Sequence, residues 1–136
     1  PLAEIGAPLE TLVALPPPRL EFTRTTIEGE VIYIDHFGNV ITSIGTCTWK
    51  GSTTNLSMSP RTGGHPAPDP FDADRARVTI GKYHFQRIAR TYTAVQPGQP
   101  TVLINSAGQL EIAINQGNAA RRLDLSPGMR VTIHLD

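Results

Sequence analysis

The chain has 136 residues, and its 12 Lys and Arg residues balance its 12 Asp and Glu residues, so its formal net charge is zero. This length suits one domain, and neutrality argues against a nucleic-acid binder, which would carry a basic excess. The apolar runs are far shorter than the roughly 20 residues that cross a bilayer. We expect no secretory signal, and the single cysteine, Cys47, excludes an internal disulfide. Composition therefore predicts a neutral, cytoplasmic domain with no membrane or nucleic-acid partner.

Residues 1–20 are predicted to be a lead-in segment. Scattered apolar residues run through it, and Pro16-Pro17-Pro18 ends it, because proline cannot donate to a helix or to an internal sheet ladder. A segment of this kind is typical of a linker between domains. We therefore assign residues 1–20 to a linker from an N-terminal domain and residues 21–136 to a C-terminal domain.

The first half of that domain predicts strands broken by turns. Residues 30–35 and 40–44 form two strands around a tight turn at 35–39. Weaker strands are expected within residues 46–58. The segment 59–74 is rich in proline and glycine and is expected to be an irregular loop.

The second half continues the same pattern. Further strands are expected at 77–80, 83–88, a stretch through Tyr92, 101–104, 109–114 and 130–135. Residues 118–123 favour one short helical turn with Asn118 as its N-cap. About seven strands with no long helix predict an all-β fold, a small antiparallel β-barrel or a sandwich, with a short helical turn near the C-terminus.

The turn at residues 35–39 is the first polar cluster. Gly38 allows a positive φ or a close backbone approach. Asp35 offers a carboxylate for an amine or a hydroxyl. Asn39 offers both a donor and an acceptor, the combination that a purine edge requires. The alternative is that Asp35 and Asn39 only satisfy the backbone N–H groups of their own turn.

The second polar cluster comprises residues 105–108 and 115–118. Its hydroxyl, amide and backbone N–H groups could hold a carboxylate or a heterocycle, and turn chemistry is again the alternative. Glu111 lies between the two parts in an alternating strand, so we expect it to face solvent. The histidines show no metal spacing, and Ser106 lacks the Gly-x-Ser-x-Gly elbow of a nucleophile. Pattern alone predicts a ligand-binding β domain without a metal.

Together the two clusters resemble a known family. Residues 29–44, with Asp35-His36-Phe37-Gly38-Asn39 at their centre, resemble the signature that opens the C-terminal domain of S-adenosylmethionine hydroxide adenosyltransferases. These enzymes are relatives of the fluorinases and chlorinases. Residues 105–120 resemble the second signature of the same domain, and the lead-in resembles the linker that precedes it.

The resemblance implies cleavage of S-adenosylmethionine at C5′ by water or hydroxide, giving adenosine and methionine, with no cofactor. It also implies a homotrimer in which the ligand lies between this domain and the N-terminal domain of a neighbouring subunit. Asp35 would hold the methionine amino group and Ser106 the methionine carboxylate. Phe37 would wall the pocket. The residues that would contact adenine are Asn39, Tyr92, Asn115 and Gln116.

Two positions depart from the halogenating members of the family. Ala107 and Ile114 stand where those enzymes carry arginine, which favours the hydrolase branch. The groups that activate water belong to the N-terminal domain, so we expect no catalytic residue in this chain. The alternatives are a halogenating relative and a non-catalytic β-barrel for nucleoside binding or oligomerisation. An oligonucleotide-binding barrel is disfavoured by the zero net charge and by an aromatic content of 6%.

Overall fold

A computed structural model describes residues 17–59 and 66–135. Most of the predicted linker and the middle of the predicted 59–74 loop lie outside the described residues. The strands are β1 (Leu20–Phe22), β2 (Thr26–Ile34), β3 (Val40–Thr42), β4 (Cys47–Trp49), β5 (Asn55–Met58), β6 (Phe71–Asp72), β7 (Arg77–Ile80), β8 (Tyr83–Phe85), β9 (Pro100–Ile104), β10 (Leu110–Ile114) and β11 (Arg130–His134). The helices are the 3₁₀ turn η2 (Tyr92–Ala94) and α1 (Ala119–Arg122).

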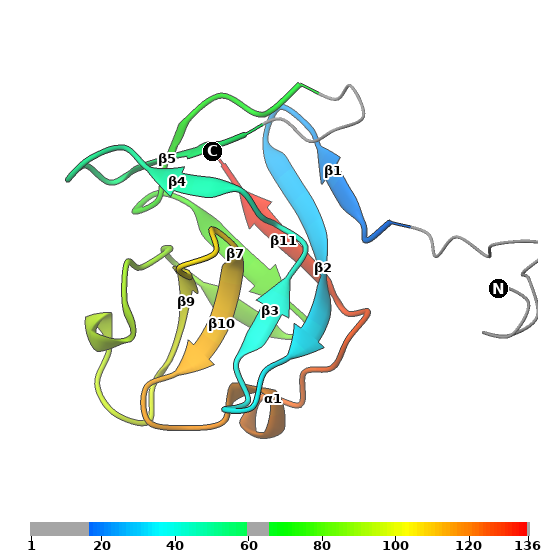
Figure 1. The fold of residues 1–136 in the computed structure, drawn as a ribbon, viewed down its shortest axis with the longest axis vertical. Helices are drawn as coiled ribbons and strands as arrows, with labels where there is room; N and C mark the ends of the chain where they lie inside the picture. The colour runs from blue at the N-terminus through cyan, green and yellow to red at the C-terminus, as the bar shows by residue number, and fades with distance from the viewer. Residues whose placement is uncertain (1–16, 60–65, 136) are drawn as a thin grey trace, which may run out of the picture.

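The main sheet curls into a barrel. Its strand order is β8-β7-β11-β2-β3-β10-β9, and β1 is added beside β2 (Figure 1). Past β8, a parallel bridge joins Ala89 to Leu103 of β9. This bridge brings the two edges of the sheet together, so seven antiparallel strands form a nearly closed barrel. The predicted all-β barrel is confirmed.

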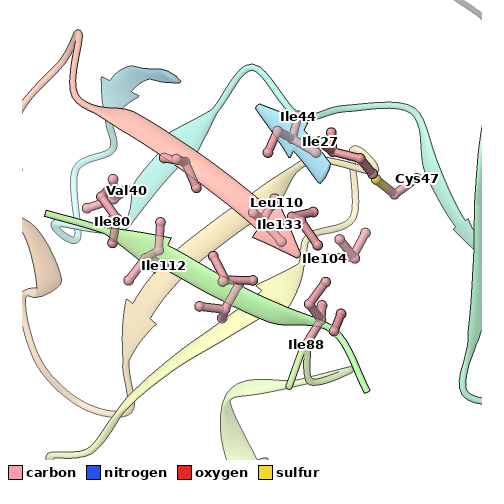
Figure 2. Packing of buried hydrophobic residues seen from close by; sticks show 14 of the residues in the cluster. Ile27, Val40, Ile44, Cys47, Ile80, Ile88, Ile104, Leu110, Ile112 and Ile133 are labelled. Atoms are coloured by element: carbon pink, nitrogen blue, oxygen red, sulfur yellow. The ribbon is translucent and has the colours of Figure 1, made fainter. Parts of the chain in front are cut away.

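Branched aliphatic side chains fill the barrel. They alternate along the strands, because successive residues of a strand point to opposite faces. Ile27, Ile112 and Ile133 come from three strands and are fully buried together. Figure 2 shows these side chains gathered in the interior, with Val40 and Ile80 among them.

The two ends of the barrel carry different additions. A small sheet, β4-β5-β6, lies at one end. The helix α1 lies at the other end, beside the turn between β2 and β3 (Figure 1). There the backbone N–H of Ala120 donates to the carbonyl of Gly38 at 2.9 Å. The helix therefore packs directly against the first polar turn.

Most of the predicted elements are present, with differences between β8 and β9. The predicted strand at 83–88 ends at Phe85, and Tyr92 begins a 3₁₀ turn, so the expected strand through Tyr92 is wrong. The chain must leave the sheet here to cross from one edge strand to the other. The predicted helical turn is confirmed, and Asn118 caps it by accepting a hydrogen bond from the backbone N–H of Arg121 at 2.9 Å.

The described part of the predicted 59–74 loop also differs from the expectation. Phe71 and Asp72 form the short strand β6, which pairs with β5. The strands expected within 46–58 are confirmed as β4, which carries Trp49, and β5, which ends at Met58. Among the described residues, no helix is long and apolar enough to span a bilayer.

Candidate functional site

Two turns of the barrel share one hydrogen-bond pattern. In the β2–β3 turn, Asp35 Oδ1 accepts the backbone N–H groups of Phe37 and Asn39, each at 2.9 Å. In the β9–β10 turn, Asn105 Oδ1 accepts those of Ala107 and Gln109, each at 3.0 Å. A short side-chain acceptor at the first turn position thus satisfies the N–H groups two and four residues later.

Glycine makes both turns possible. Gly38 has a φ of 84° and Gly108 a φ of 80°, values that side chains other than glycine rarely adopt. The N–H of each glycine donates to the first carbonyl of its turn, from Gly38 to Asp35 and from Gly108 to Asn105, at 3.0 Å. The alternative that Asp35 satisfies its own turn is therefore correct for Oδ1, while Oδ2 has a different partner.

A cleft of about 530 Å³ lies between these two turns. It crosses the outer face of β3, β10 and β9 and is bordered by the segment that carries η2. Its lining residues are Tyr33, Asp35, Phe37, Asn39, Ile41, Arg90, Thr91, Tyr92, Leu103, Ile104, Asn105, Ser106, Ala107, Gln109 and Glu111.

Glu111 lies at the centre of this face. It is directly opposite Ile41 on β3 and Leu103 on β9, and opposite residues share a face of the sheet. Its chain neighbours Leu110 and Ile112 point into the core, so Glu111 points outward. The predicted alternation is correct, but the expected exposure is wrong, because Glu111 is only 3% exposed.

The segment around Tyr92 covers Glu111. Tyr92 Oη donates to Glu111 Oε1 at 2.8 Å, and Ala89 is bridged to Leu103 beside it. The cover is anchored at its far end, where Asn115 Nδ2 donates to the carbonyl of Val95 at 2.9 Å. A segment with little regular structure therefore completes the outer face of the sheet.

Asn39 links Glu111 and Tyr92 to the first turn. Its Nδ2 donates to Asp35 Oδ2 at 3.0 Å and, at a longer 3.5 Å, to Tyr92 Oη. Burial raises the pKa of Tyr92 to about 12, helped by its hydrogen bond to Glu111 and by the negative charges of Glu111 and Asp35. The four side chains form one connected polar network along the cleft.

Aromatic rings stand at the rim of the cleft. Phe37 is 73% exposed, Tyr33 46% and Tyr92 39%, and they are the exposed large hydrophobic residues of the described chain. All three line the cleft. Exposed apolar side chains gathered at one place are typical of a binding surface.

The structure brings five of the seven predicted site residues to this cleft: Asp35, Phe37, Asn39, Tyr92 and Ser106. Asn115 and Gln116 do not line it. Asn115 lies just past β10 and holds Val95, and Gln116 is exposed with a φ of 59°. Their predicted contacts with adenine stay predictions.

Arg90 and Glu111 also line the cleft, but neither was among the predicted site residues. Arg90 Nη2 donates to the carbonyls of Gly51 at 2.8 Å and Thr53 at 2.6 Å. Its guanidinium also stacks 4.3 Å from the ring centroid of Trp49. It thereby ties the β4–β5 hairpin to the wall of the cleft. No sequence signal marked Arg90, whereas the alternation along β10 did place Glu111 on the outer face.

The cleft offers no metal site. Within residues 17–59 and 66–135, no three His, Cys, Asp or Glu side chains come together in a way that could hold an ion. Its polar groups suit the recognition of an organic ligand with amine, hydroxyl or carboxylate groups.

The fold and the site together define a small antiparallel β-barrel with a polar, aromatic-rimmed cleft on its outer face. Residues 29–132 match the SAM hydroxide adenosyltransferase C-terminal domain, and the chain belongs to this family. The resemblance seen in the two turn sequences is thereby confirmed.

Similar curated proteins carry the name (R)-S-adenosyl-L-methionine hydrolase. The one from Salinispora tropica is 33% identical and is matched over 98% of this chain and 43% of its own length. The one from Thermus thermophilus is 32% identical over 93% of this chain and 38% of its own length. The chain therefore spans less than half the length of these relatives.

Solved structures share the fold. A crystal structure of an uncharacterized conserved protein from Thermotoga maritima superposes with a TM-score of 0.62 at 29% identity, covering 98% of this chain and 44% of the other. A conserved hypothetical protein from Thermus thermophilus gives a TM-score of 0.57 at 30% identity, covering 98% of this chain and 45% of the other.

Proposed function

We propose that this domain recognises the adenosyl and methionine parts of S-adenosylmethionine in an enzyme that cleaves the substrate at C5′ with water or hydroxide. The products would be adenosine and L-methionine. One observation carries the proposal: residues from three separate segments, around 35–39, 92 and 106, line one cleft. The family resemblance assigns ligand contacts to these three segments and to residues 115–116, which do not line the cleft.

The chemistry of the cleft supports recognition of both parts of the substrate. Asp35 Oδ2 is a carboxylate oxygen with one side-chain donor, Asn39 Nδ2, and it has room to accept an ammonium group. Ser106 is exposed at the tip of the second turn, where its hydroxyl can donate to a carboxylate. The rings of Phe37 and Tyr92 offer apolar faces to a purine.

Catalysis would require protein beyond this chain. Neither a nucleophile nor an activated base emerges from the cleft chemistry, so the groups that orient and activate water would come from an N-terminal domain. The exposed aromatic rim fits a site completed by such a domain of a neighbouring subunit in a homotrimer. A cytoplasmic location fits the supply of this substrate and the single buried thiol of Cys47.

A product assay tests the proposal. The longest natural reading frame that contains this chain is purified and incubated with S-adenosylmethionine, with and without excess chloride, and nucleosides are identified by liquid chromatography with mass detection. We expect adenosine and methionine in equal amounts, unaffected by chloride. The 136-residue chain alone, as a control, should release neither product.

Other products would redirect the proposal. A 5′-halogenated adenosine would assign the protein to the halogenating branch despite Ala107 in the cleft. Binding of adenosine without turnover by the longest reading frame would support a nucleoside-binding barrel. Failure to bind S-adenosylmethionine or adenosine would contradict the proposed recognition.

A further inference from the structure

In the polar network of the cleft, it is fixed which side-chain atoms donate hydrogen bonds and which accept them. Asn39 has two amide hydrogens, and both are used, one on Asp35 Oδ2 at 3.0 Å and one on Tyr92 Oη at 3.5 Å. Turning the amide would set Asn39 Oδ1 against the Asp35 carboxylate, two acceptors facing each other. The amide orientation is therefore fixed, and Asn39 has only its carbonyl oxygen left for a ligand.

Tyr92 is also committed as a donor. Its phenol has one hydrogen, which goes to Glu111 Oε1 at 2.8 Å. The pKa of about 12 keeps this hydrogen in place at neutral pH. Toward any further partner, Tyr92 Oη can only accept.

One carboxylate oxygen of Glu111, Oε2, remains available to a ligand in the cleft. Within the described part of the chain, Oε1 accepts from Tyr92, and Oε2 accepts no hydrogen bond. No buried side-chain nitrogen or oxygen among these residues lacks a partner, so Oε2 is not sealed in the protein and must reach the cleft surface. A carboxylate oxygen is an acceptor only.

The placement of Glu111 is costly for the fold. The carboxylate lies between the apolar side chains of Ile41 and Leu103 and is 3% exposed, with one phenol as its hydrogen-bond donor. Burying a charge with so few partners is unfavourable. A positively charged group faces the cleft from Arg90, but its Nη2 is bonded to Gly51 and Thr53. Within the described part of the chain, Oε2 of this carboxylate therefore has no donor, and a group of a bound ligand could supply one.

We propose that Glu111 makes this part of the cleft an acceptor-only surface, contacts the ligand through Oε2, and selects ligands by the hydrogens or positive charge that they present. The inference rests on the proposed function and adds a specificity-determining residue to it. The ligand group that Glu111 recognises can be the cationic centre beside C5′, which attracts the carboxylate by its charge, or the 6-amino group of adenine, which donates a hydrogen bond to it. Either one is an electropositive partner for an acceptor, and the experiment separates them.

Two matched ligand pairs provide the test. Sinefungin carries an ammonium group where S-adenosylhomocysteine has a neutral thioether, and neither is cleaved in the proposed reaction. Adenosine carries the 6-amino group that purine riboside lacks. Dissociation constants are measured by calorimetry on the longest natural protein that contains this chain. We expect the donating member to bind more tightly in at least one pair, by roughly tenfold.

Glu111→Gln is the decisive variant. With its carbonyl oxygen held by Tyr92, the glutamine turns an NH₂ group toward the cleft, so an acceptor becomes a donor while the shape is kept. We expect the preference in that pair to fall to about one. Glu21→Gln is the control, because Glu21 has an exposed side chain paired with Arg19 at 3.4 Å, away from the cleft. It should leave both preferences unchanged.

The binding results for the two ligand pairs either support or overturn the role of Glu111. Loss of the sinefungin preference places Glu111 at the cationic centre, and loss of the adenosine preference places it at the base; either supports the inference. Equal weakening of all four ligands by Glu111→Gln, or a wild-type protein that favours neither donating ligand, overturns it. If Glu111→Gln does not fold, Glu111→Leu takes its place, because leucine suits the apolar neighbours Ile41 and Leu103 and also removes the acceptor, and the same loss of preference is expected. A wild type that binds none of the four contradicts the proposed function itself.

Discussion

Asp35 performs two tasks with its two oxygens. Oδ1 holds two backbone N–H groups of the turn, and Oδ2 holds the amide of Asn39. In Asp35→Asn, one oxygen is replaced by an NH₂ group that faces the NH₂ group of Asn39. We expect a loss of about 1–3 kcal/mol in the free energy of unfolding, because a hydrogen bond becomes a clash of donors. Chemical denaturation measures it.

The ligand response of Asp35→Asn separates the two tasks. If Asp35 holds an amine, the variant weakens sinefungin more than adenosine, since adenosine has no aliphatic amine. The control is Asp74→Asn, at an exposed residue paired with Arg87 at 3.7 Å, and it should change stability by less than about 0.5 kcal/mol. Equal weakening of both ligands would limit Asp35 to shaping the turn.

Tyr92 makes stability depend on alkaline pH. Its pKa is about 12 in the folded protein against an ordinary value of 10.0, so the folded state holds the phenolic hydrogen more tightly than the unfolded state. This contribution to stability is present below pH 10 and is lost as the pH rises toward 12. We expect Tyr92→Phe to flatten that part of the stability profile. The free energy of unfolding of both proteins, measured from pH 8 to 11, checks this expectation. A Tyr92→Phe profile that matches the wild type would contradict the assignment of the pH dependence to Tyr92. Tyr33→Phe, at another tyrosine of the same cleft, is the control.

The β2–β3 turn and α1 depend on each other through Gly38. A Cβ at this position would overlap the side-chain amide of Asn118, which caps the helix. Gly128 also has a positive φ, of 92°, but an added Cβ there meets nothing within 4 Å. Gly128→Ala should therefore cost only the left-handed strain, about 1–2 kcal/mol.

Gly38→Ala should cost more than Gly128→Ala, by about 1–3 kcal/mol, because the overlap adds to the strain. Thermal unfolding of both variants measures the difference. Gly38→Ala should also reduce affinity for adenosine, since the turn positions Asn39. Equal losses in stability for the two variants would show that the turn and the helix are not coupled.

Local signals explain which elements the sequence could predict. Both polar turns are short patterns, an Asp or Asn followed three residues later by glycine, and their hydrogen bonds span at most four residues. The helical turn with its Asn118 cap is equally local. These features, and the alternation of β10, were accessible from the sequence because each depends on near neighbours.

The polar network at Glu111 was not accessible in the same way. Tyr92 and Glu111 are 19 residues apart, and Asn39 and Tyr92 are 53 apart. The segment that covers Glu111 has little periodicity, so no pattern shows on which face of the sheet it lies. The same reason explains why the exposure of Glu111 and the strand at Tyr92 were predicted wrongly.

The molecule as a whole gathers its exposed aromatic rings on one face. Phe37 is 73% exposed beside two exposed tyrosines, while the barrel interior is closed. The chain spans 43% of the Salinispora tropica relative. Exposing apolar rings to water is unfavourable, and a ligand or further protein that covers the rim would remove this unfavourable contact. Function at this face and stability of the barrel should therefore be separable by mutation.

Phe37→Ser tests that separation in the longest natural protein. Because the ring is exposed in this domain, its loss should change the unfolding free energy of the domain by less than about 0.5 kcal/mol. If the ring is covered by ligand and a neighbouring domain, affinity for adenosine should fall by about 1.5–3 kcal/mol, the cost of losing a buried side chain of this size. His84→Ser, at an exposed residue of the edge strand β8, is the control and should change neither quantity. Unchanged affinity in Phe37→Ser, with the fold intact, would place the ligand elsewhere on the barrel.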